Sequence, residues 1–131
     1  SVQMLCTALD SKGFETPYKP THRHHPCVHW VAESWDNFTW LADLADALNA
    51  EYRFRYSRQR DHASIAALDR IRRLEYESRG LTEFAQAMPE EYKVPGDAVT
   101  AYRQFYLGEK APFASWTRRP EPDWWVSRHA A

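Results

Sequence analysis

The segment NFTWLADLADALNAEYRFRYSRQRDH, residues 37–62, decides the fold class of this chain. Its apolar side chains follow the i, i+3, i+4 spacing of one helix face, and they are Phe38, Leu41, Leu44, Ala45, Leu48 and Tyr52. Ser34 or Asp36 is a suitable N-terminal cap. The pattern therefore predicts one long helix over residues 37–56, with that stripe buried.

The segment before this helix, TPYKPTHRHHPCVHW (residues 16–30), is polar and interrupted by prolines, which is typical of a loop. Pro26 suits the first position of a helix, and His25 stands just before it as a capping residue. We expect a short helix from Pro26 to about Glu33. Residues 2–9 (VQMLCTAL) form either a buried strand or a helical turn, because a run this short has no decisive periodicity.

Three further segments follow the long helix. A helix is expected over residues 63–79, because Ile65, Leu68, Ile71 and Leu74 recur every three residues, and Gly80 has the usual place of a residue that ends a helix. Residues 81–88 (LTEFAQAM) indicate a short helix or turn before Pro89. Asp97 is expected to start a last helix over residues 98–110.

The composition fits one folded domain over residues 1–131. The chain is 44% hydrophobic and 27% charged, values typical of a globular protein. We predict a mainly α, single-domain fold with long, Pro-rich, ordered loops. Its parts are an N-terminal segment and loop (1–25), a helical body (26–110) and a C-terminal tail (111–131) that contains Trp116, Trp124 and Trp125.

Charge and residue usage narrow the function classes. The net charge of −1 and pI near 6.6 predict no overall attraction to nucleic acid, so such a contact requires a local basic face. With four glycines in the chain, a Gly-rich nucleotide-binding loop is excluded, and we expect no cofactor. Two cysteines and the lack of a long apolar run predict a cytoplasmic protein (host cytoplasm for a viral one) with no membrane contact.

A histidine cluster lies next to Pro26. It contains His22, His24, His25 and His29, with Cys27 between them. His25 and His29 are four residues apart, the spacing at which two histidines on a helix bind zinc when His62 or Glu51 supplies a further ligand. The alternative is that these residues cap a helix or form ordinary hydrogen bonds. We favour no metal, and name His25 and His29 as the ligands if one is bound.

Glu51, Arg55 and His62 form a second group around the end of the long helix. Glu51 and Arg55 are an i, i+4 pair, which on an exposed helix is a salt bridge of a few tenths of a kcal/mol. The functional alternative is that Glu51 transfers protons while Arg55 holds an anion, because active sites combine carboxylate, histidine and arginine in this way. The sequence leaves both alternatives open.

A third group surrounds PEEYK, residues 89–93. Lys93 lies in a Pro-flanked turn, where a lysine with a lowered pKa can act as an amine nucleophile. The alternative is an ordinary solvated lysine. Arg103 and Tyr106 follow on the expected last helix.

The run HHPCVHWVAESWDNFTWLADLADALNAEYRFRYSRQRDH, residues 24–62, resembles pyrimidine-dimer DNA glycosylases of the phage endonuclease V type. The shared features are His25-Pro26, Trp30, Trp40-Leu41, Glu51-Tyr52 with Arg55, and His62. Together with TPYKPTH, FAQAMPEEYK and AYRQFYLGEK, this run also resembles uncharacterised proteins from phage genomes. The resemblance covers about a third of the chain.

The resemblance implies an all-α fold and a base-excision reaction. In that reaction an amine attacks the sugar C1′, a Schiff base forms, and a carboxylate assists strand cleavage. Our leading hypothesis is a phage-type, DNA- or nucleotide-directed protein that acts on a damaged or modified pyrimidine. The candidate catalytic residues are Glu51, His25, His62 and Lys93. The candidate substrate-binding residues, which hold phosphate or stack a base, are Tyr18, Lys19, His22, Trp30, Asn37, Trp40, Arg55, Arg58, Arg103 and Tyr106.

Two alternatives belong to other classes. Aromatic residues make up 15% of the chain, which also fits a non-enzymatic binding module or a homodimer that uses an aromatic surface such as the Trp-rich tail. The third hypothesis is a small metal-dependent hydrolase built on the histidine cluster.

Overall fold

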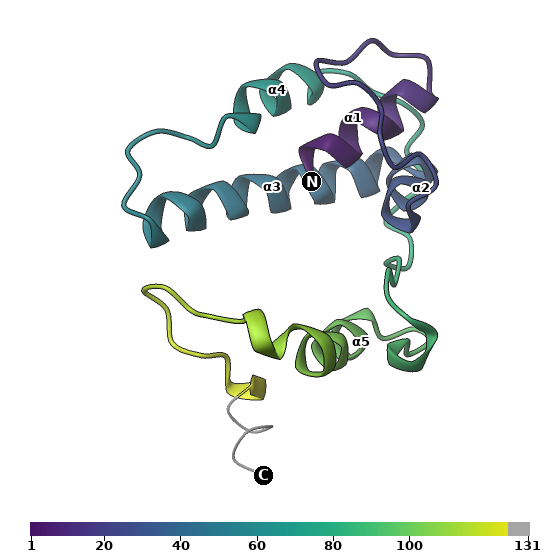
Figure 1. Cartoon of the computed structure of the whole chain (residues 1–131). Coiled ribbons are helices and arrows are strands. Elements are labelled where there is room, and N and C mark those ends of the chain that lie inside the picture. The colour runs from purple at the N-terminus through teal and green to yellow at the C-terminus, as the bar shows by residue number, and fades with distance from the viewer. Residues whose placement is uncertain (126–131) are drawn as a thin grey trace. The chain divides into compact units, whose positions relative to one another are not determined.

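The computed structural model describes residues 1–125, which form helices joined by loops with no β-strand within that range (Figure 1). The predicted mainly α fold is confirmed. The backbone groups into two compact units, residues 1–85 and 86–131, and each is described by itself. The single domain over 1–131 stays a prediction, and the last part of the predicted tail, residues 126–131, lies outside the described residues.

The first unit begins with α1 (Val2–Ser11). The sequence left a strand and a helical turn open here, and the structure has a helix. Its buried face includes Leu5, Cys6 and Leu9. These positions follow helical spacing, so a helix places all three against the same core.

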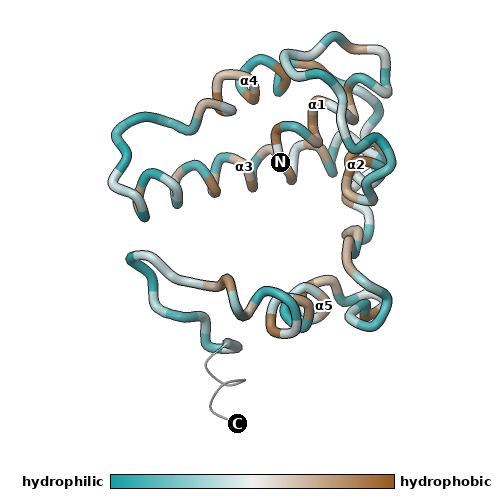
Figure 2. The backbone as a smooth tube through the Cα atoms, in the orientation of Figure 1, coloured by the Kyte–Doolittle hydropathy of each residue, from teal (hydrophilic) through white to brown (hydrophobic). Residues whose placement is uncertain are grey.

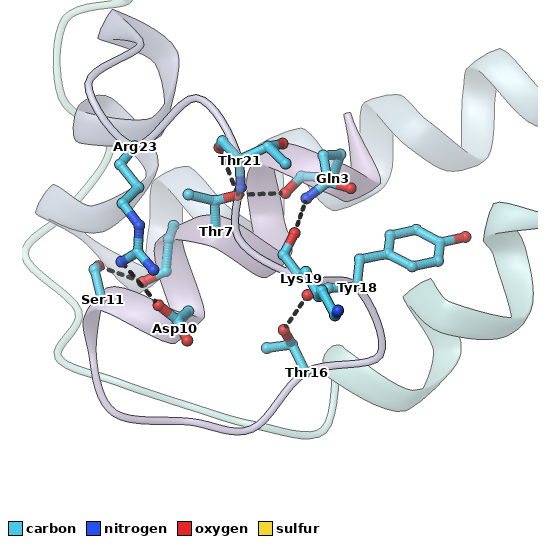
Figure 3. A network of polar contacts seen from close by, with 10 residues as sticks. Gln3, Thr7, Asp10, Ser11, Thr16, Tyr18, Lys19, Thr21 and Arg23 are labelled. Atoms are coloured by element: carbon cyan, nitrogen blue, oxygen red, sulfur yellow. Dashed lines mark hydrogen bonds and ion pairs between the residues drawn. The ribbon is translucent and has the colours of Figure 1, made fainter.

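The predicted loop after α1 is attached to that helix by polar contacts (Figure 3). The Gln3 side chain donates to the carbonyl of Lys19 (2.7 Å), and the backbone N–H of Thr21 donates to Thr7 Oγ1 (3.1 Å). Arg23 forms an ion pair with Asp10 (3.2 Å). Because the first two contacts bind backbone groups of the loop, they order its path without using the Lys19 side chain.

The next two helices agree closely with the sequence. α2 (Pro26–Glu33) starts at Pro26 as predicted. α3 (Trp35–Arg55) is capped by Ser34, whose side chain accepts from the N–H of Asp36 (3.2 Å). Ser34 was one of the two predicted caps, and the observed helix covers most of the predicted 37–56.

The buried stripe of α3 differs from the predicted one. Phe38, Leu41, Ala42 and Ala45 are buried, whereas Leu44 and Leu48 are 36% and 52% exposed. Two alanines on the buried face provide a narrow surface for neighbouring helices, and the larger leucines lie to one side of it. Polar and apolar residues alternate along α3 in Figure 2. The prediction that Leu44 and Leu48 are core residues was therefore wrong.

α4 (Ser64–Ile71) completes the first unit and lies beside α1 and α3 (Figure 1). Its Ala67, Leu68 and Ile71 enter the same core as α1, α2 and α3. Arg72, just after α4, forms ion pairs with Asp43 (2.8 Å) and Asp46 of α3. α4 therefore packs against α3 through apolar contacts, and ion pairs of Arg72 add to this contact.

The predicted helix over residues 63–79 was wrong beyond Ile71. The backbone of the following segment instead bonds to the first turn of α3. Glu77 O accepts from the N–H of Trp35 (2.9 Å), Arg79 N donates to Ser34 Oγ (2.9 Å), and Gly80 N donates to Asp36 Oδ2 (2.8 Å). These contacts need an extended chain, so tertiary hydrogen bonds override the helical pattern.

Gly80 has a different role from the predicted helix end. Its φ of +81° is in the left-handed region that glycine adopts without steric cost. Here that conformation serves the turn that brings its N–H to Asp36 and continues the chain to Thr82.

The second unit is built around α5 (Ala98–Phe105). A 3₁₀ turn η1 (Glu90–Tyr92) precedes it, and η2 (Tyr106–Lys110), a π turn, and η3 (Ala111–Phe113) follow it. Asp97 caps α5 as predicted, by accepting from the N–H of Thr100 (3.1 Å). The sequence indicates a short helix or a turn at residues 81–88. The structure has no regular helix there.

The tail tryptophans pack together within the second unit. Trp125 is only 4% exposed, and its ring lies 4.8 Å from that of Trp116 and 5.8 Å from that of Trp124. The guanidinium of Arg103 lies 5.4 Å from the Trp124 ring centre. The described part of the tail is therefore held by aromatic and cation–π contacts.

The sequence predicts no membrane contact, and the length and hydropathy of the helices can be compared with those of a membrane-spanning helix. Within residues 1–125, none of them combines the length and apolar character needed to cross a bilayer.

We predict that Asn37→Ala lowers the free energy of unfolding by about 3 kcal/mol, because it leaves buried backbone groups without partners. Asn37 is fully buried, donates to Trp30 O (2.7 Å) and accepts from the N–H of Thr82 (3.0 Å). Urea unfolding followed by circular dichroism measures the loss. Thr39→Ala on the exposed side of α3 is the control, with a change expected within about 0.5 kcal/mol. Equal effects of the two substitutions would contradict the assigned role of Asn37.

Candidate functional site

The predicted site residues are distributed over both units. The second unit contains Lys93, Arg103 and Tyr106, and the first contains the rest. Within the first unit, the end of α3 and the loop that follows it bring several polar groups together. That region is the candidate functional site.

Two side chains of α3 shape the loop of residues 56–62. The guanidinium of Arg53 donates to the carbonyls of Arg58 (3.4 Å) and Gln59 (2.9 Å) and forms an ion pair with Asp61 (3.4 Å). Asn49 donates to Asp61 (2.9 Å). The loop also contains Ser57, whose positive φ of 51° is uncommon outside glycine. The loop is thus ordered by α3.

A cavity of about 170 Å³ lies beside this loop. Its apolar wall is formed by Val2, Ala45, Leu48 and Ile65, and its other lining residues are Ser1, Asn49, Tyr52, His62 and Ser64. A cavity of this size is smaller than the sites that hold drug-sized ligands, which start near about 300 Å³. It suits one small ring or a molecule of similar size.

Ser1 also belongs to this lining. Partial burial lowers the pKa of its amino group, because the charged form loses solvation there, and the nearby Cys27 raises it by a smaller amount.

His62 is held at the edge of the cavity. Its backbone N–H donates to Asn49 Oδ1 (2.8 Å), and its ring meets that of Tyr52 edge-on, with 5.4 Å between the centres. Its Nδ1 accepts from the backbone N–H of Ser64 (3.2 Å). The ring is therefore ordered on two sides although it lies at the surface.

Glu51 and Arg55 form the predicted i, i+4 ion pair, with 2.9 Å between Oε2 and Nε. Both side chains are about a third exposed, so the pair contributes at most a modest amount to stability. The contact is confirmed, and a role of Glu51 in proton transfer stays a prediction.

Further arginines surround the loop. The side chains of Arg58 and Arg60 are exposed. Arg53 binds the backbone carbonyls of Arg58 and of Gln59, which lies between the two arginines. Anchoring of the loop backbone leaves these side chains at the surface, where a phosphate group can reach them.

His25 caps α2 through Nδ1, which accepts from the N–H of Cys27 (3.0 Å). The predicted capping role is confirmed. His22 is exposed and has a positive φ of 52°, and the rings of His24 and His29 lie 6.1 Å apart. Within residues 1–125, no group of three or more His, Cys, Asp or Glu residues is arranged to hold a metal ion.

The proposed base-stacking residues differ in accessibility. Trp30 is 5% exposed, and its ring packs against Trp40 (5.9 Å) and Phe84 (5.3 Å). Trp40 is 40% exposed, which leaves part of its ring open to a ligand. Tyr18 is half-buried against the core. Asn37 is buried, with its amide used by the main chain.

In the second unit, Lys93 Nζ lies 2.6 Å from Glu90 Oε1, so the amine is paired with a carboxylate. Arg103 lies over Trp124. Tyr106 is 49% exposed, and its ring lies 6.4 Å from that of Phe105. These residues therefore have structural contacts of their own, and a functional role for them stays a prediction.

Several residues of the cavity were not candidates from the sequence, namely Asn49, Tyr52, Ser64 and Ile65. Tyr52 and Ile65 were assigned to apolar helix faces, and Asn49 was given no role. The sequence contains no signal that the chain reverses direction at residues 56–61 and places His62 next to Asn49. That contact is what assembles the cavity.

Comparison with models of protein families, with curated proteins and with solved structures finds no match to this chain.

We predict that His25→Ala lowers the free energy of unfolding by about 1 kcal/mol, because the N–H of Cys27 loses its acceptor. His25→Asn keeps an acceptor at the capping position and is expected to retain most of the stability. Thermal unfolding of the two variants beside the wild-type protein measures the difference. If the two variants are destabilised equally, the capping contact is not the cause.

Proposed function

We propose that this chain is a DNA- or nucleotide-directed protein that acts on a pyrimidine base or its sugar, as a DNA glycosylase and abasic-site lyase. The observation that carries the proposal is the small cavity at the end of α3, bordered by His62 and followed along the chain by exposed arginines. The resemblance of residues 24–62 to glycosylases of the endonuclease V type supports the same function.

The size of the cavity fits this chemistry. Enzymes that act on a base remove it from the helical stack and hold it in a close-fitting pocket between aromatic and apolar side chains. Tyr52, Leu48 and Ile65 supply such walls here. A single ring fits a cavity of about 170 Å³ better than a whole nucleotide does, so the sugar and phosphate would remain outside.

The charges near the cavity fit a phosphate backbone. The chain has a net charge of −1, so attraction to DNA must be local. Arg58 and Arg60 on the ordered loop form such a basic face, and Lys19, exposed on the loop after α1, adds to the basic surface of this unit. Contacts of this kind weaken as the salt concentration rises, because bound counterions are released.

In this proposal Glu51 and His62 assist proton transfer, and Arg55 orients Glu51 through their ion pair. An amine of the protein attacks C1′ of the sugar as the bond to the base breaks, and a proton from the amine goes to the leaving base. The C1′–O4′ bond then opens, O4′ takes up the second proton, and C1′ forms a Schiff base with the amine. The residue that is trapped by reduction identifies the amine.

We expect cleavage of DNA duplexes that contain a thymine dimer, an abasic site or hydroxymethyluracil, together with a covalent adduct after borohydride reduction. Glu51→Gln is expected to lower the cleavage rate at least a hundredfold, the usual contribution of a general acid or base. The control is Glu75→Gln, an exposed glutamate beyond α4, which should retain the wild-type rate. Failure to cleave or trap any of the three duplexes would remove the glycosylase–lyase function.

A homodimer or non-enzymatic binding module is the second candidate, and a surface of α3 favours it. Trp40, Leu44 and Leu48 are spaced four residues apart and are 40%, 36% and 52% exposed. A continuous apolar stripe on a helix is typical of an interaction surface. The tail is a weaker candidate than we expected, because Trp125 is buried within its own unit.

We predict that, if this stripe forms a dimer, Leu44→Glu converts the dimer to a monomer, because a charge cannot be buried there without a partner. Ala50→Glu, an exposed position of the same helix, is the matched control and should leave the dimer intact. Sedimentation velocity measures both. A wild-type protein that sediments as a monomer at high concentration would remove this candidate.

A further inference from the structure

The two ring nitrogens of His62 have different environments. The backbone N–H of Ser64 points to Nδ1 (3.2 Å), and Ser64 Oγ lies 2.9 Å from the same nitrogen. A backbone N–H can only donate, so Nδ1 must be the acceptor in this contact. In the neutral imidazole the proton then belongs to Nε2.

The main chain around the ring is fixed by α3. Asn49 Oδ1 accepts from the N–H of His62 (2.8 Å), while its Nδ2 donates to Asp61 (2.9 Å). Tyr52 packs against the imidazole with an angle of 80° between the rings. The contact with Ser64 therefore selects the tautomer, and Asn49 sets the position from which the ring acts.

The other residues that line the cavity suit a ligand that accepts a hydrogen bond from His62. None of the side chains that line it within the described chain is a carboxylate, and the Asn49 amide already contacts Asp61 and the main chain of His62. The walls from Ala45, Leu48 and Ile65 are apolar. A flat ring that carries a carbonyl oxygen matches these walls and the Nε2–H donor together.

We propose that His62 donates a hydrogen bond through Nε2 to a carbonyl oxygen of a pyrimidine ring held in this cavity, with Asn49 and Ser64 as its positioning residues. The proposal rests on the proposed function and names the ligand group, a keto pyrimidine nucleotide such as one that carries uracil. A neutral imidazole whose Nδ1 is occupied by Ser64 has no other unprotonated nitrogen, so His62 acts as the donor at this position.

The tautomer is tested without any ligand. Long-range ¹H–¹⁵N spectra of the neutral protein distinguish a protonated Nε2 from a protonated Nδ1 by their nitrogen shifts. The expected result is predominantly the Nε2–H form at His62. A predominant Nδ1–H form would overturn the proposal.

Ligand binding is tested with two substitutions that divide the functions of the ring. In His62→Asn, the side-chain oxygen takes the place of Nδ1 and still accepts from Ser64, but the donor is lost. In His62→Gln, the amide nitrogen takes the place of Nε2, and the capping acceptor is lost. Each protein is titrated with 2′-deoxyuridine monophosphate and with 2-deoxyribose 5-phosphate, which share the phosphate and differ by the base.

The expected wild-type preference for 2′-deoxyuridine monophosphate over the sugar phosphate is about tenfold. His62→Asn should lose roughly fivefold of that preference, the usual effect of one hydrogen bond, while His62→Gln keeps most of it. Three outcomes would overturn the proposal. The wild-type protein binds both ligands equally, it binds neither, or His62→Asn prefers 2′-deoxyuridine monophosphate as strongly as the wild type does.

Cleavage of the damaged duplexes is a separate measurement, so it can succeed when this inference fails. If no duplex is cleaved but the uracil preference depends on His62, then the proposed reaction fails and the binding site stands.

Discussion

The first turn of α3 holds a distant part of the chain, and the first unit depends on that interaction. Ser34, Asp36 and Asn37 accept backbone N–H groups from Arg79, Gly80 and Thr82 in turn. Ser34 and Asn37 are buried, where an unpaired polar group is costly. A helix N-terminus that would otherwise be capped only locally thus becomes the attachment point for residues more than forty positions away.

This attachment fixes the path of residues 73–85 along the first unit. Their extended path brings Tyr76 and Phe84 onto the core, where the Tyr76 hydroxyl donates to Val31 O (2.6 Å) and the Phe84 ring packs on Trp30 and Trp40. Burial raises the pKa of Tyr76 well above its usual range, because the phenolate would lose solvation. The hydroxyl therefore keeps its proton, and its hydrogen bond to Val31 O, at neutral pH.

The opposite end of α3 uses the same kind of contact to build the candidate site. Side chains of Asn49 and Arg53 bind main-chain groups of residues 58–62 and place His62 beside Tyr52. The Glu51–Arg55 pair and the His25 cap could be predicted because both are local, with partners two to four residues apart. The cavity could not be predicted, because it requires the reversal of the chain between α3 and α4.

Sequence by itself determined the helical fold, the limits of α2, two candidate caps for α3 of which Ser34 is the one used, and the start of α5. Each of these follows from nearest-neighbour effects, namely helical periodicity, proline at a first helical position, and side chains that cap the next turn. Only the tertiary structure decided where α4 ends, which face of α3 is buried and which residues surround the cavity. Residues 72–79 have a helical pattern, but their N–H groups gain buried acceptors on α3 only when the chain is extended. Long-range hydrogen bonds of this kind leave no periodic mark in the sequence.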